Sequence, residues 1–227
     1  MRRIAISDIH GCLDSFKALL QQIELTKEDT LFLLGDYIDR GPNSKGVIDH
    51  IWYLQESGYT VHCLLGNHEK MLLDEYHPRE SFYRAYPEAL RSFGVQHVAD
   101  IPEEYIEWMD ELDAYLEIDG YILVHAGLSF KSNNPLADRK SMIWIRDWQT
   151  TIDKEWLGDR VIVHGHTPLY RKKIIKSLKK LEEMPVINID AGCCFTYKGM
   201  GYLCALDLDE LTLTFQERME VMAVKKK

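Results

Sequence analysis

The stretch Leu31-Phe32-Leu33-Leu34-Gly35-Asp36-Tyr37-Ile38-Asp39-Arg40-Gly41 decides the fold of this chain of 227 residues. Its first four residues are an apolar run, which is typical of a buried strand, and the run ends in a glycine followed by charged residues. Five fixed residues in the pattern G-D-x-x-D-R-G are expected by chance in only about one chain in ten thousand of this length. The stretch therefore predicts a buried strand whose carboxyl end carries a functional loop.

The same strand pattern recurs along the chain, and each apolar run ends at a polar or glycine-containing turn. Helical patterns lie between several of these runs; after the first run, for example, Leu13, Phe16 and Leu20 fall on one helical face. Strands alternating with helices predict an α/β fold, and the length predicts one domain over residues 1–227. The apolar runs are Ile4–Ile6, Leu31–Leu34, Val61–Leu65, Tyr121–Val124, Val161–Val163, Val186–Ile189 and Tyr202–Leu206.

Residues 70–117 interrupt the alternation and predict a helical insertion. Apolar residues recur there at helical spacing, at Tyr105, Met109, Leu112 and Leu116. The segment is also crowded with aromatic residues, which either pack against the sheet and one another or form a lid over a site. Both interpretations are kept open at this point.

Composition and charge exclude several classes of protein. The formal net charge of −9, from 27 Lys and Arg against 36 Asp and Glu, argues against a stable nucleic-acid complex. No apolar run approaches the ~18 residues of a membrane span, so we expect a soluble, cytoplasmic protein with reduced cysteines. The basic stretch 171–180 is either a solvated face or a surface that attracts a phosphorylated protein or polyphosphate.

Five clusters of metal-ligand residue types follow predicted strands. Side chains at the carboxyl ends of neighbouring strands converge on one crevice, so these clusters should meet. Carboxylate, imidazole and amide donors without a thiolate suit manganese first, with iron, zinc, cobalt or nickel as alternatives. The clusters are Asp8-Ile9-His10, Gly35–Gly41, Gly66-Asn67-His68-Glu69, His125-Ala126-Gly127 and Gly165-His166-Thr167.

The donor set is large enough for two divalent metal ions. Asp36, at the centre of the longest cluster, is best placed to bridge two ions spaced ~3.5–4 Å and to help align a hydroxide for attack on phosphorus. The first ion would take Asp8 and His10 as further ligands, and the second would take Asn67, His125 and His166.

Four further residues are assigned to catalysis and substrate binding. His68 would protonate the leaving oxygen, and Asp39 would fix its tautomer and raise its pKa. Arg40 offers a planar fork for phosphate oxygens, and Arg146 offers a second one. Asn67 is also a candidate substrate contact. In contrast, Glu69 is expected to orient a neighbour or begin a helix, and His164 to be structural.

The ordered series D-x-H, G-D-Y-I-D-R-G, G-N-H-E, V-H-A-G and G-H-T resembles the calcineurin-like metallophosphoesterases, specifically the bacterial and phage branch of the phosphoprotein phosphatases. The resemblance runs from Asp8 to Thr167. It implies a four-layer α-β-β-α sandwich, a dinuclear site with the ligands named above, Asp39 and His68 as the acid pair, and Arg40 as the phosphate clamp. Arg146 matches only by its place in a W-I-R segment. The chain departs from the eukaryotic enzymes in one respect. Their C-terminal S-A-P-N-Y-type segment is absent, and Asn188–Gly192 stands near its place.

The predicted function is hydrolysis of phosphomonoesters by attack of metal-bound hydroxide, with phosphoserine or phosphothreonine in proteins as the expected substrate. The alternative is symmetrical hydrolysis of a dinucleoside polyphosphate such as diadenosine tetraphosphate, with Tyr83 or Trp108 stacking an adenine. The partner is accordingly a phosphorylated protein or a small phosphorylated molecule. A module that binds phosphoprotein without turnover is disfavoured, because every ligand and acid position is present.

Overall fold

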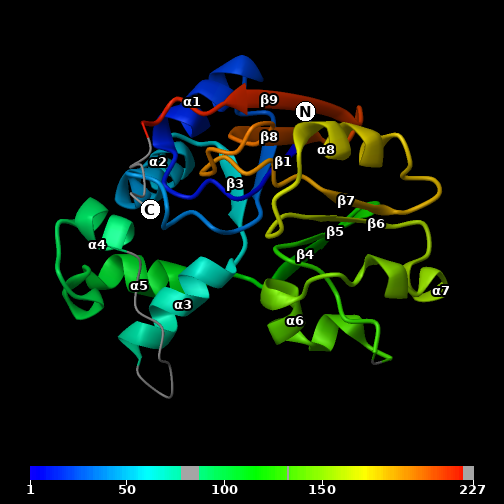
Figure 1. Cartoon of the computed structure of the whole chain (residues 1–227), viewed down its shortest axis with the longest axis horizontal. Helices are drawn as coiled ribbons and strands as arrows, with labels where there is room; N and C mark the ends of the chain where they lie inside the picture. Colours follow the sequence, from blue (N-terminus) through cyan, green and yellow to red (C-terminus); the bar gives the residue numbers. More distant parts are fainter. Residues whose placement is uncertain (78–86, 132, 222–227) are drawn as a thin grey trace.

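The computed structural model describes residues 1–77, 87–131 and 133–221 (Figure 1). The strands are β1 (Arg3–Ile6), β2 (Thr30–Leu33), β3 (Thr60–Cys63), β4 (Tyr115–Ile118), β5 (Tyr121–Val124), β6 (Val161–His164), β7 (Val186–Asn188), β8 (Tyr202–Asp207) and β9 (Thr212–Glu217). The α-helices are α1 (Leu13–Gln22), α2 (Ser44–Glu56), α3 (Asn67–Tyr76), α4 (Pro87–Phe93), α5 (Glu103–Asp110), α6 (Arg139–Trp144), α7 (Lys154–Leu157) and α8 (Arg171–Leu178). Short 3₁₀ turns lie at Val98–Asp100, Pro135–Ala137 and Gln149–Thr151.

The strands form two sheets. The first has the order β3-β2-β1-β8-β9, with β1, β2 and β3 parallel and β8 antiparallel to β1. The second has the order β4-β5-β6-β7, with β5, β6 and β7 parallel and β4 antiparallel to β5. Each sheet therefore contains three parallel strands whose carboxyl ends lie at one edge.

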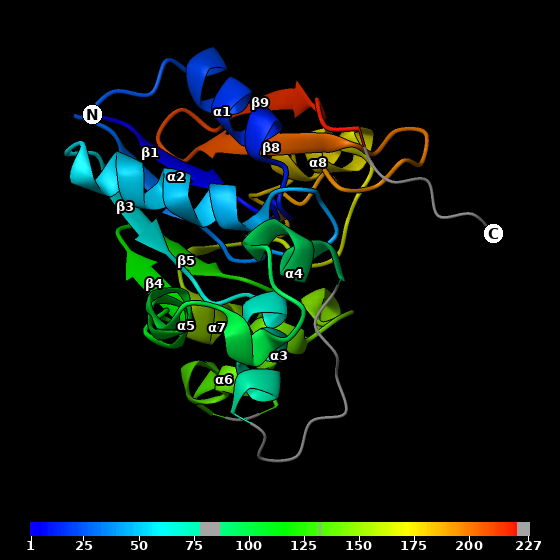
Figure 2. The same cartoon turned by 90° about the vertical axis from the view of Figure 1, so that its left-hand side faces the viewer.

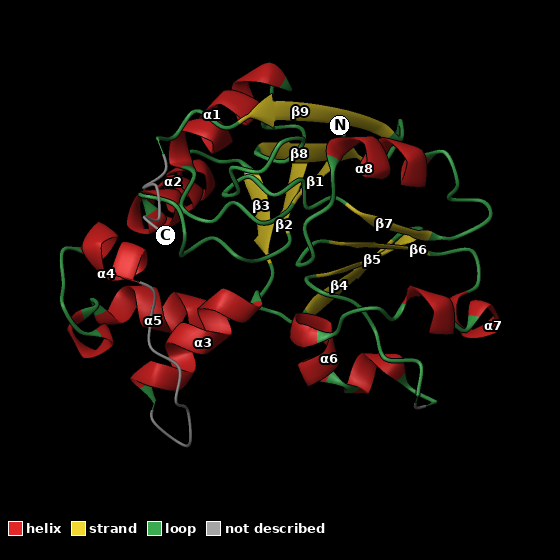
Figure 3. Cartoon of the chain, viewed as in Figure 1, coloured by secondary structure: helices red, strands yellow, loops and turns green. Residues whose placement is uncertain are grey.

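Alternation of side chains along the strands explains why the two sheets stack. In β2, Leu31 and Leu33 pack toward α1 and α2, whereas Phe32 belongs to the core between the sheets. In β5, Leu123 lies in that same core, whereas Ile122 packs with residues of α6 and α7. Helices thus cover the outer face of each sheet (Figures 2 and 3). The expected four-layer α-β-β-α sandwich is confirmed.

The segment that interrupts the alternation is largely helical but ends in a strand. Helix α4 lies next to α2, and α3 and α5 pack against each other below it (Figure 2). The prediction that helical spacing continues through Leu116 is wrong, because Tyr115–Ile118 is β4, with Leu116 opposite Leu123 of β5. A turn at Asp119 and Gly120, with φ +78° at the glycine, makes a β-hairpin more favourable than a helix here.

The aromatic residues around α5 pack on one another. Tyr105 stacks on Trp52 with ring centroids 4.7 Å apart, and Trp108 lies 5.4 Å from Tyr37 and 6.2 Å from Trp52. These contacts favour the packing interpretation for Trp108. Tyr83, the other residue considered for stacking an adenine, lies outside the described residues, and a lid stays a prediction.

Two further sequence expectations concern cysteines and membranes. All five cysteines are free thiols, and four of them are buried. Among the residues that the structure describes, no helix is both long enough and apolar enough to cross a bilayer.

Candidate metal centre

The predicted ligand clusters converge on the crevice formed by the carboxyl ends of the parallel strands. Many of these residues have left-handed backbone conformations, which are uncommon outside glycine and concentrate at functional sites. The loops after β1, β2 and β6 are therefore shaped to aim particular side chains rather than to connect elements by the shortest route. The residues with positive φ are Asp8 (53°), His10 (48°), Asp36 (56°), Asp39 (69°), Arg40 (65°) and His166 (71°).

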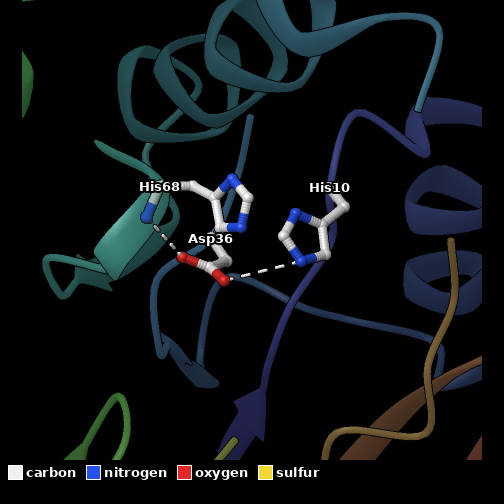
Figure 4. A group of neighbouring side chains, drawn as sticks. All are labelled: His10, Asp36 and His68. Carbon is white, nitrogen blue, oxygen red and sulfur yellow. Dashed lines mark hydrogen bonds and ion pairs between the residues drawn. The ribbon is translucent and has the colours of Figure 1, made fainter. Parts of the chain in front are cut away.

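Asp36 lies at the centre of the cluster, between imidazoles from different elements (Figure 4). Its Oδ2 is 3.5 Å from Nε2 of His10, and its Oδ1 is 3.4 Å from Nε2 of His125. Oδ1 also accepts a hydrogen bond of 3.0 Å from the backbone N–H of His68. One carboxylate thus faces two potential ligands through different oxygens, as a bridging ligand requires.

Backbone carbonyls hold the imidazole rings of two of these ligands. Nδ1 of His10 is 2.9 Å from the carbonyl of Ile38, and Nδ1 of His125 is 2.9 Å from the carbonyl of Leu34. A carbonyl only accepts, so in each ring Nδ1 carries the proton and Nε2 presents its lone pair. For His125 that lone pair faces the Asp36 carboxylate, which is also an acceptor. A cation between these acceptors would satisfy both of them.

Asn67 makes the corresponding contacts with the second group of ligands. Its Oδ1 is 3.1 Å from Nε2 of His125 and 2.7 Å from Nδ1 of His166. Nε2 of His166 is buried without a hydrogen-bond partner among the described residues. Buried polar atoms are seldom left unsatisfied, so this atom is consistent with a site built for a ligand that side chains alone do not supply.

The electrostatics of the crevice also fit cations. Asp8 is 1% exposed, and both of its carboxylate oxygens accept from the backbone N–H of His166 at 3.1 Å. Burial, and then the charges of Asp190 and Asp36, raise the pKa of Asp8 well above its usual value. Burial also raises the pKa of Asp190 to about 7. Three buried carboxylates repel one another here, and divalent ions would offset that repulsion.

The imidazoles are held in the neutral form that metal ligation requires. Burial lowers the pKa of His10 well below its usual value, with the positive charge of Arg40 adding to the effect. Burial lowers the pKa of His125 and brings that of His166 to about 3. A metal ion would therefore displace no proton from these three rings at neutral pH.

His68 and Asp39 form a buried pair close to Asp36. Nδ1 of His68 is 2.7 Å from Oδ2 of Asp39, and the ring lies edge-on to His10 with centroids 4.7 Å apart. Burial opposes a charge on His68, but the carboxylate of Asp36 and the hydrogen bond that the ring donates to Asp39 outweigh it and raise the pKa of His68. The raised pKa favours the protonated ring, which is the form that a proton donor requires.

Two arginines flank the cluster. Nη1 of Arg40 is 2.6 Å from Nε2 of His10, and its guanidinium lies 5.5 Å from the Phe195 ring centroid. Arg146 is exposed, donates to Oγ1 of Thr167 at 3.2 Å, and lowers the pKa of the adjacent His166. Both guanidinium groups therefore lie at the edge of the crevice, where an anionic substrate would enter.

Three further residues near the crevice, Glu69, His164 and Asp190, were not predicted as metal ligands. Glu69 is fully buried and orients a loop, as expected: it accepts from the N–H groups of Asp36, Tyr37, Ile38 and Gly66 at 2.8–3.2 Å. His164 is buried with its ring centroid 5.3 Å from that of Trp148, and among the described residues it belongs to no group of potential metal ligands. Asp190 was not predicted as a site residue; its position directly after the apolar run Val186–Ile189 was the available signal.

The predicted ligands fit a pair of metal ions. Donor atoms of His10, Asp36 and His68 lie within 4.8 Å of one another, and so do those of Asp36, His125 and His166. Asp36 belongs to both groups. The donors are carboxylate, imidazole and amide, which suit iron and zinc as well as manganese, so the preference for manganese stays a prediction.

A scan against protein families matches residues 1–196 to the calcineurin-like phosphoesterases. The chain belongs to this family. Its members act through dinuclear metal centres, and the His and Asp groups of this phosphoesterase could bind such ions.

Curated relatives match only part of the phosphoesterase. The symmetrical bis(5'-nucleosyl)-tetraphosphatases of Salmonella arizonae and Salmonella typhimurium are 47% and 46% identical to it over 74 residues, which is 32% of this chain and 25% of each relative. The chain thus spans about a quarter of the length of the curated relatives that it matches.

Solved structures extend the likeness over the whole chain. A candidate diadenosine tetraphosphatase superposes with a TM-score of 0.65 at 21% identity, covering 99% of this chain and 95% of that one. A serine/threonine phosphatase from Saccharomyces cerevisiae gives a TM-score of 0.67 at 14% identity, covering 99% and 82%. At these identities the likeness supports the fold alone.

Proposed function

We propose that this phosphoesterase hydrolyses phosphomonoesters, with phosphoserine and phosphothreonine in proteins as its substrates. The observation that carries the proposal is the buried pair of His68 and Asp39, with 2.7 Å between Nδ1 and Oδ2, next to Asp36, whose Oδ1 accepts from the backbone N–H of His68. An alkoxide is a poor leaving group and departs readily only when it is protonated. A positioned acid contributes most for such an ester.

The proposed division of labour follows from the positions of the side chains. Two divalent ions held by Asp8, His10, Asp36, Asn67, His125 and His166 would supply Lewis-acid activation of water and of the phosphoryl oxygens. Arg40 and Arg146 bind the outer phosphate oxygens and orient the ester. His68 donates a proton to the leaving oxygen through Nε2, while Asp39 accepts from Nδ1 and keeps the ring in that orientation.

A second candidate function is symmetrical hydrolysis of diadenosine tetraphosphate. It is favoured by the similarity to the tetraphosphatases, which covers 74 residues. It uses the same centre, but its leaving group is a nucleotide phosphate, which departs without strong help from an acid. The role of His68 therefore separates the two functions chemically.

A substrate panel tests the choice directly. The manganese-supplemented protein is assayed with a phosphoserine peptide, a phosphotyrosine peptide, a phosphodiester and diadenosine tetraphosphate, and kcat/KM is compared. We expect the highest value for the phosphoserine peptide. If diadenosine tetraphosphate is preferred over the peptide by about tenfold or more, the second function replaces the first.

The bridging role of Asp36 is tested by Asp36→Asn, with metal content and turnover measured in parallel. The amide removes the charge that both ions share, so we expect loss of at least one ion per chain and a fall in kcat of about 10³-fold or more. Asp74→Asn, on the partly exposed side of α3, serves as the matched control and should keep both metal and activity. Survival of the metal pair and of turnover in Asp36→Asn would show that Asp36 is not the bridge.

A further inference from the structure

A third group of potential metal ligands lies outside the catalytic crevice. Donor atoms of Cys12, Cys193 and Glu220 lie within 4.8 Å of one another, the same spacing that unites the ligands of the candidate centre. Cys12 precedes α1, Cys193 lies in the connection between β7 and β8, and Glu220 follows β9. Three distant segments of the chain therefore bring their donor atoms to one point.

The three side chains are buried, and two neighbours fix their positions. Their exposed fractions are 0%, 1% and 9%. The carboxylate of Glu220 accepts hydrogen bonds from both the backbone N–H and the hydroxyl of Ser15. Arg218 donates to the carbonyl of Cys193 at 3.3 Å and so holds that loop against the segment that leads to Glu220. Such supporting hydrogen bonds orient metal ligands in known sites.

We propose that Cys12, Cys193 and Glu220 bind one zinc ion or another thiophilic divalent ion, at a site distinct from the catalytic pair. Two sulfur donors and one carboxylate match zinc, whereas the catalytic donor set contains no thiolate. Binding releases one proton from each thiol and forms two metal–sulfur bonds and one metal–oxygen bond. The fourth tetrahedral position is filled by water.

Occupancy of this site would link the N-terminal end of α1, the loop between β7 and β8, and the segment after β9. That loop also carries Cys194, whose Sγ is 4.0 Å from Nη1 of Arg40. The ion would thus fix the loop that borders the proposed phosphate clamp. Glu220 at 9% exposure, next to Val221 at 94%, gives the ion a route from solvent.

A purely structural role for the three residues makes a different prediction. In that case Glu220 stabilises the first turn of α1 through Ser15, and the two thiols only fill space. No thiolate would then bind a metal. The two accounts differ in a spectroscopic signal that does not depend on catalysis.

The test uses the intact protein with its catalytic centre loaded with manganese. Cobalt(II) is added in steps, and thiolate-to-cobalt charge transfer is followed in the near ultraviolet. Exchange of cobalt into the catalytic centre gives no such band, because that centre has no thiolate. We expect a band that saturates at one equivalent. The signal does not require turnover, so it can succeed or fail independently of the proposed function.

Variants assign the band to these side chains. Cys12→Ser and Cys193→Ser should each abolish it, and Glu220→Gln should weaken cobalt binding about tenfold or more. Cys63→Ser, at a thiol in β3, is the matched control and should leave the band unchanged. If the serine variants fail to fold, wild type and Glu220→Gln still decide the question.

Three results would overturn the proposal: no band in wild type, a band unaffected by Glu220→Gln, or three rather than five reactive thiols in the denatured, unreduced protein. The last result would show that Cys12 and Cys193 form a disulfide instead of a metal site.

Discussion

At the scale of single residues, the centre is defined by which atoms accept and which donate. The carbonyls of Ile38 and Leu34 place the protons of His10 and His125 on Nδ1, so each Nε2 presents a lone pair. The lone pair of His10 accepts from Arg40, whereas that of His125 faces the Asp36 carboxylate. Without a cation this arrangement sets acceptor against acceptor in a buried space, which is unfavourable. Bound cations would also explain the left-handed backbone conformations of the predicted ligands and the crowding of buried carboxylates.

The role of Asp39 leads to a prediction at this scale. Asp39→Asn should keep both metal ions but lower kcat by about 10²–10⁴-fold on a phosphoserine peptide, because His68 loses the carboxylate that holds its proton. The loss should be much smaller on an aryl phosphate with a good leaving group. Metal analysis and kcat on both substrates check this. A loss of metal in Asp39→Asn would instead place Asp39 among the ligands.

The sequence predicts which residues are potential ligands, but it does not predict which other residues contact and orient them. Asp8 and Asp36 could be predicted because each follows an apolar strand, and parallel strands deliver their ends to one edge. Asp190 also follows an apolar run, Val186–Ile189, but it stands in no recognisable motif, and its proximity to Asp8 depends on how the two sheets stack. Contacts between sheets leave no periodic signal in the chain.

At the scale of elements, Glu69 ties the loop after β2 to the start of α3. Gly35 shows how closely the two approach: with φ +94°, a Cβ on it would lie 2.6 Å from the backbone nitrogen of Gly66. Helix α3 begins at Asn67, so the same contact that closes the loop also aims a predicted ligand. The geometry of two ligand clusters thus depends on one carboxylate.

Removal of that carboxylate should be strongly destabilising. Glu69→Ala leaves four buried N–H groups without an acceptor, so we expect unfolding in urea to show a loss of about 3 kcal/mol or more. Metal content should fall as well, since the loop carries Asp36. Glu107→Ala, at an exposed position of α5, should change stability by less than about 0.5 kcal/mol. If Glu69→Ala keeps normal metal content and stability, Glu69 does not hold the loop after β2 against the start of α3.

The starts of β1 and β2 are linked by Asp29, which accepts from the backbone N–H of Arg2 at 3.0 Å and from its Nη2 at 2.7 Å. The Arg2 guanidinium holds the pKa of Asp29 well below its usual range. A depressed folded pKa means that the carboxylate stabilises the fold above the unfolded pKa of about 3.9, and that this contribution is lost as pH falls further.

This sign gives a prediction for pH dependence. Asp29→Asn should lower the free energy of unfolding by about 2 kcal/mol at pH 7, and the difference from wild type should shrink as pH drops from 5 toward 2. Urea denaturation at several pH values measures it. A difference that stays constant or grows in acid would show that the charge of Asp29 is not what stabilises the strand pair.

Helices were predictable from sequence where only one helical face is buried, and strands were predictable where an apolar run ends in a motif. Helix α2 follows from Val47, Ile51 and Leu54 on one face. The strand β4 was not predictable, because Leu116 continues a helical spacing by coincidence and only pairing with β5 reveals its true neighbours. The sandwich was predicted only from the family resemblance, because the pattern of residues along a strand does not indicate which sheet packs against which.

At the scale of the whole molecule, the sign of the charge differs between the crevice and the rest of the protein once metal ions are bound. The formal charge is −9, which counts Asp8 and Asp36 as free carboxylates. Two divalent ions would add four positive charges at one point, next to Arg40 and Arg146, and would make the crevice locally positive on an acidic body. An acidic protein can therefore attract a phosphorylated substrate without offering a broad surface to nucleic acid.

The same charges couple metal binding to stability. Ions that bind the folded crevice and not the unfolded chain would each contribute about 2.7 kcal/mol at a free concentration one hundred times their dissociation constant. For a chain of this size, that corresponds to a Tm lowered by about 5–11 °C per ion removed. Calorimetry before and after chelation measures the shift, and added manganese should restore both Tm and activity. Asp36→Asn should show little response to manganese, because its centre is already impaired. An unchanged Tm after verified metal loss would mean that the ions removed were not bound in the crevice, and would contradict its assignment as a metal centre.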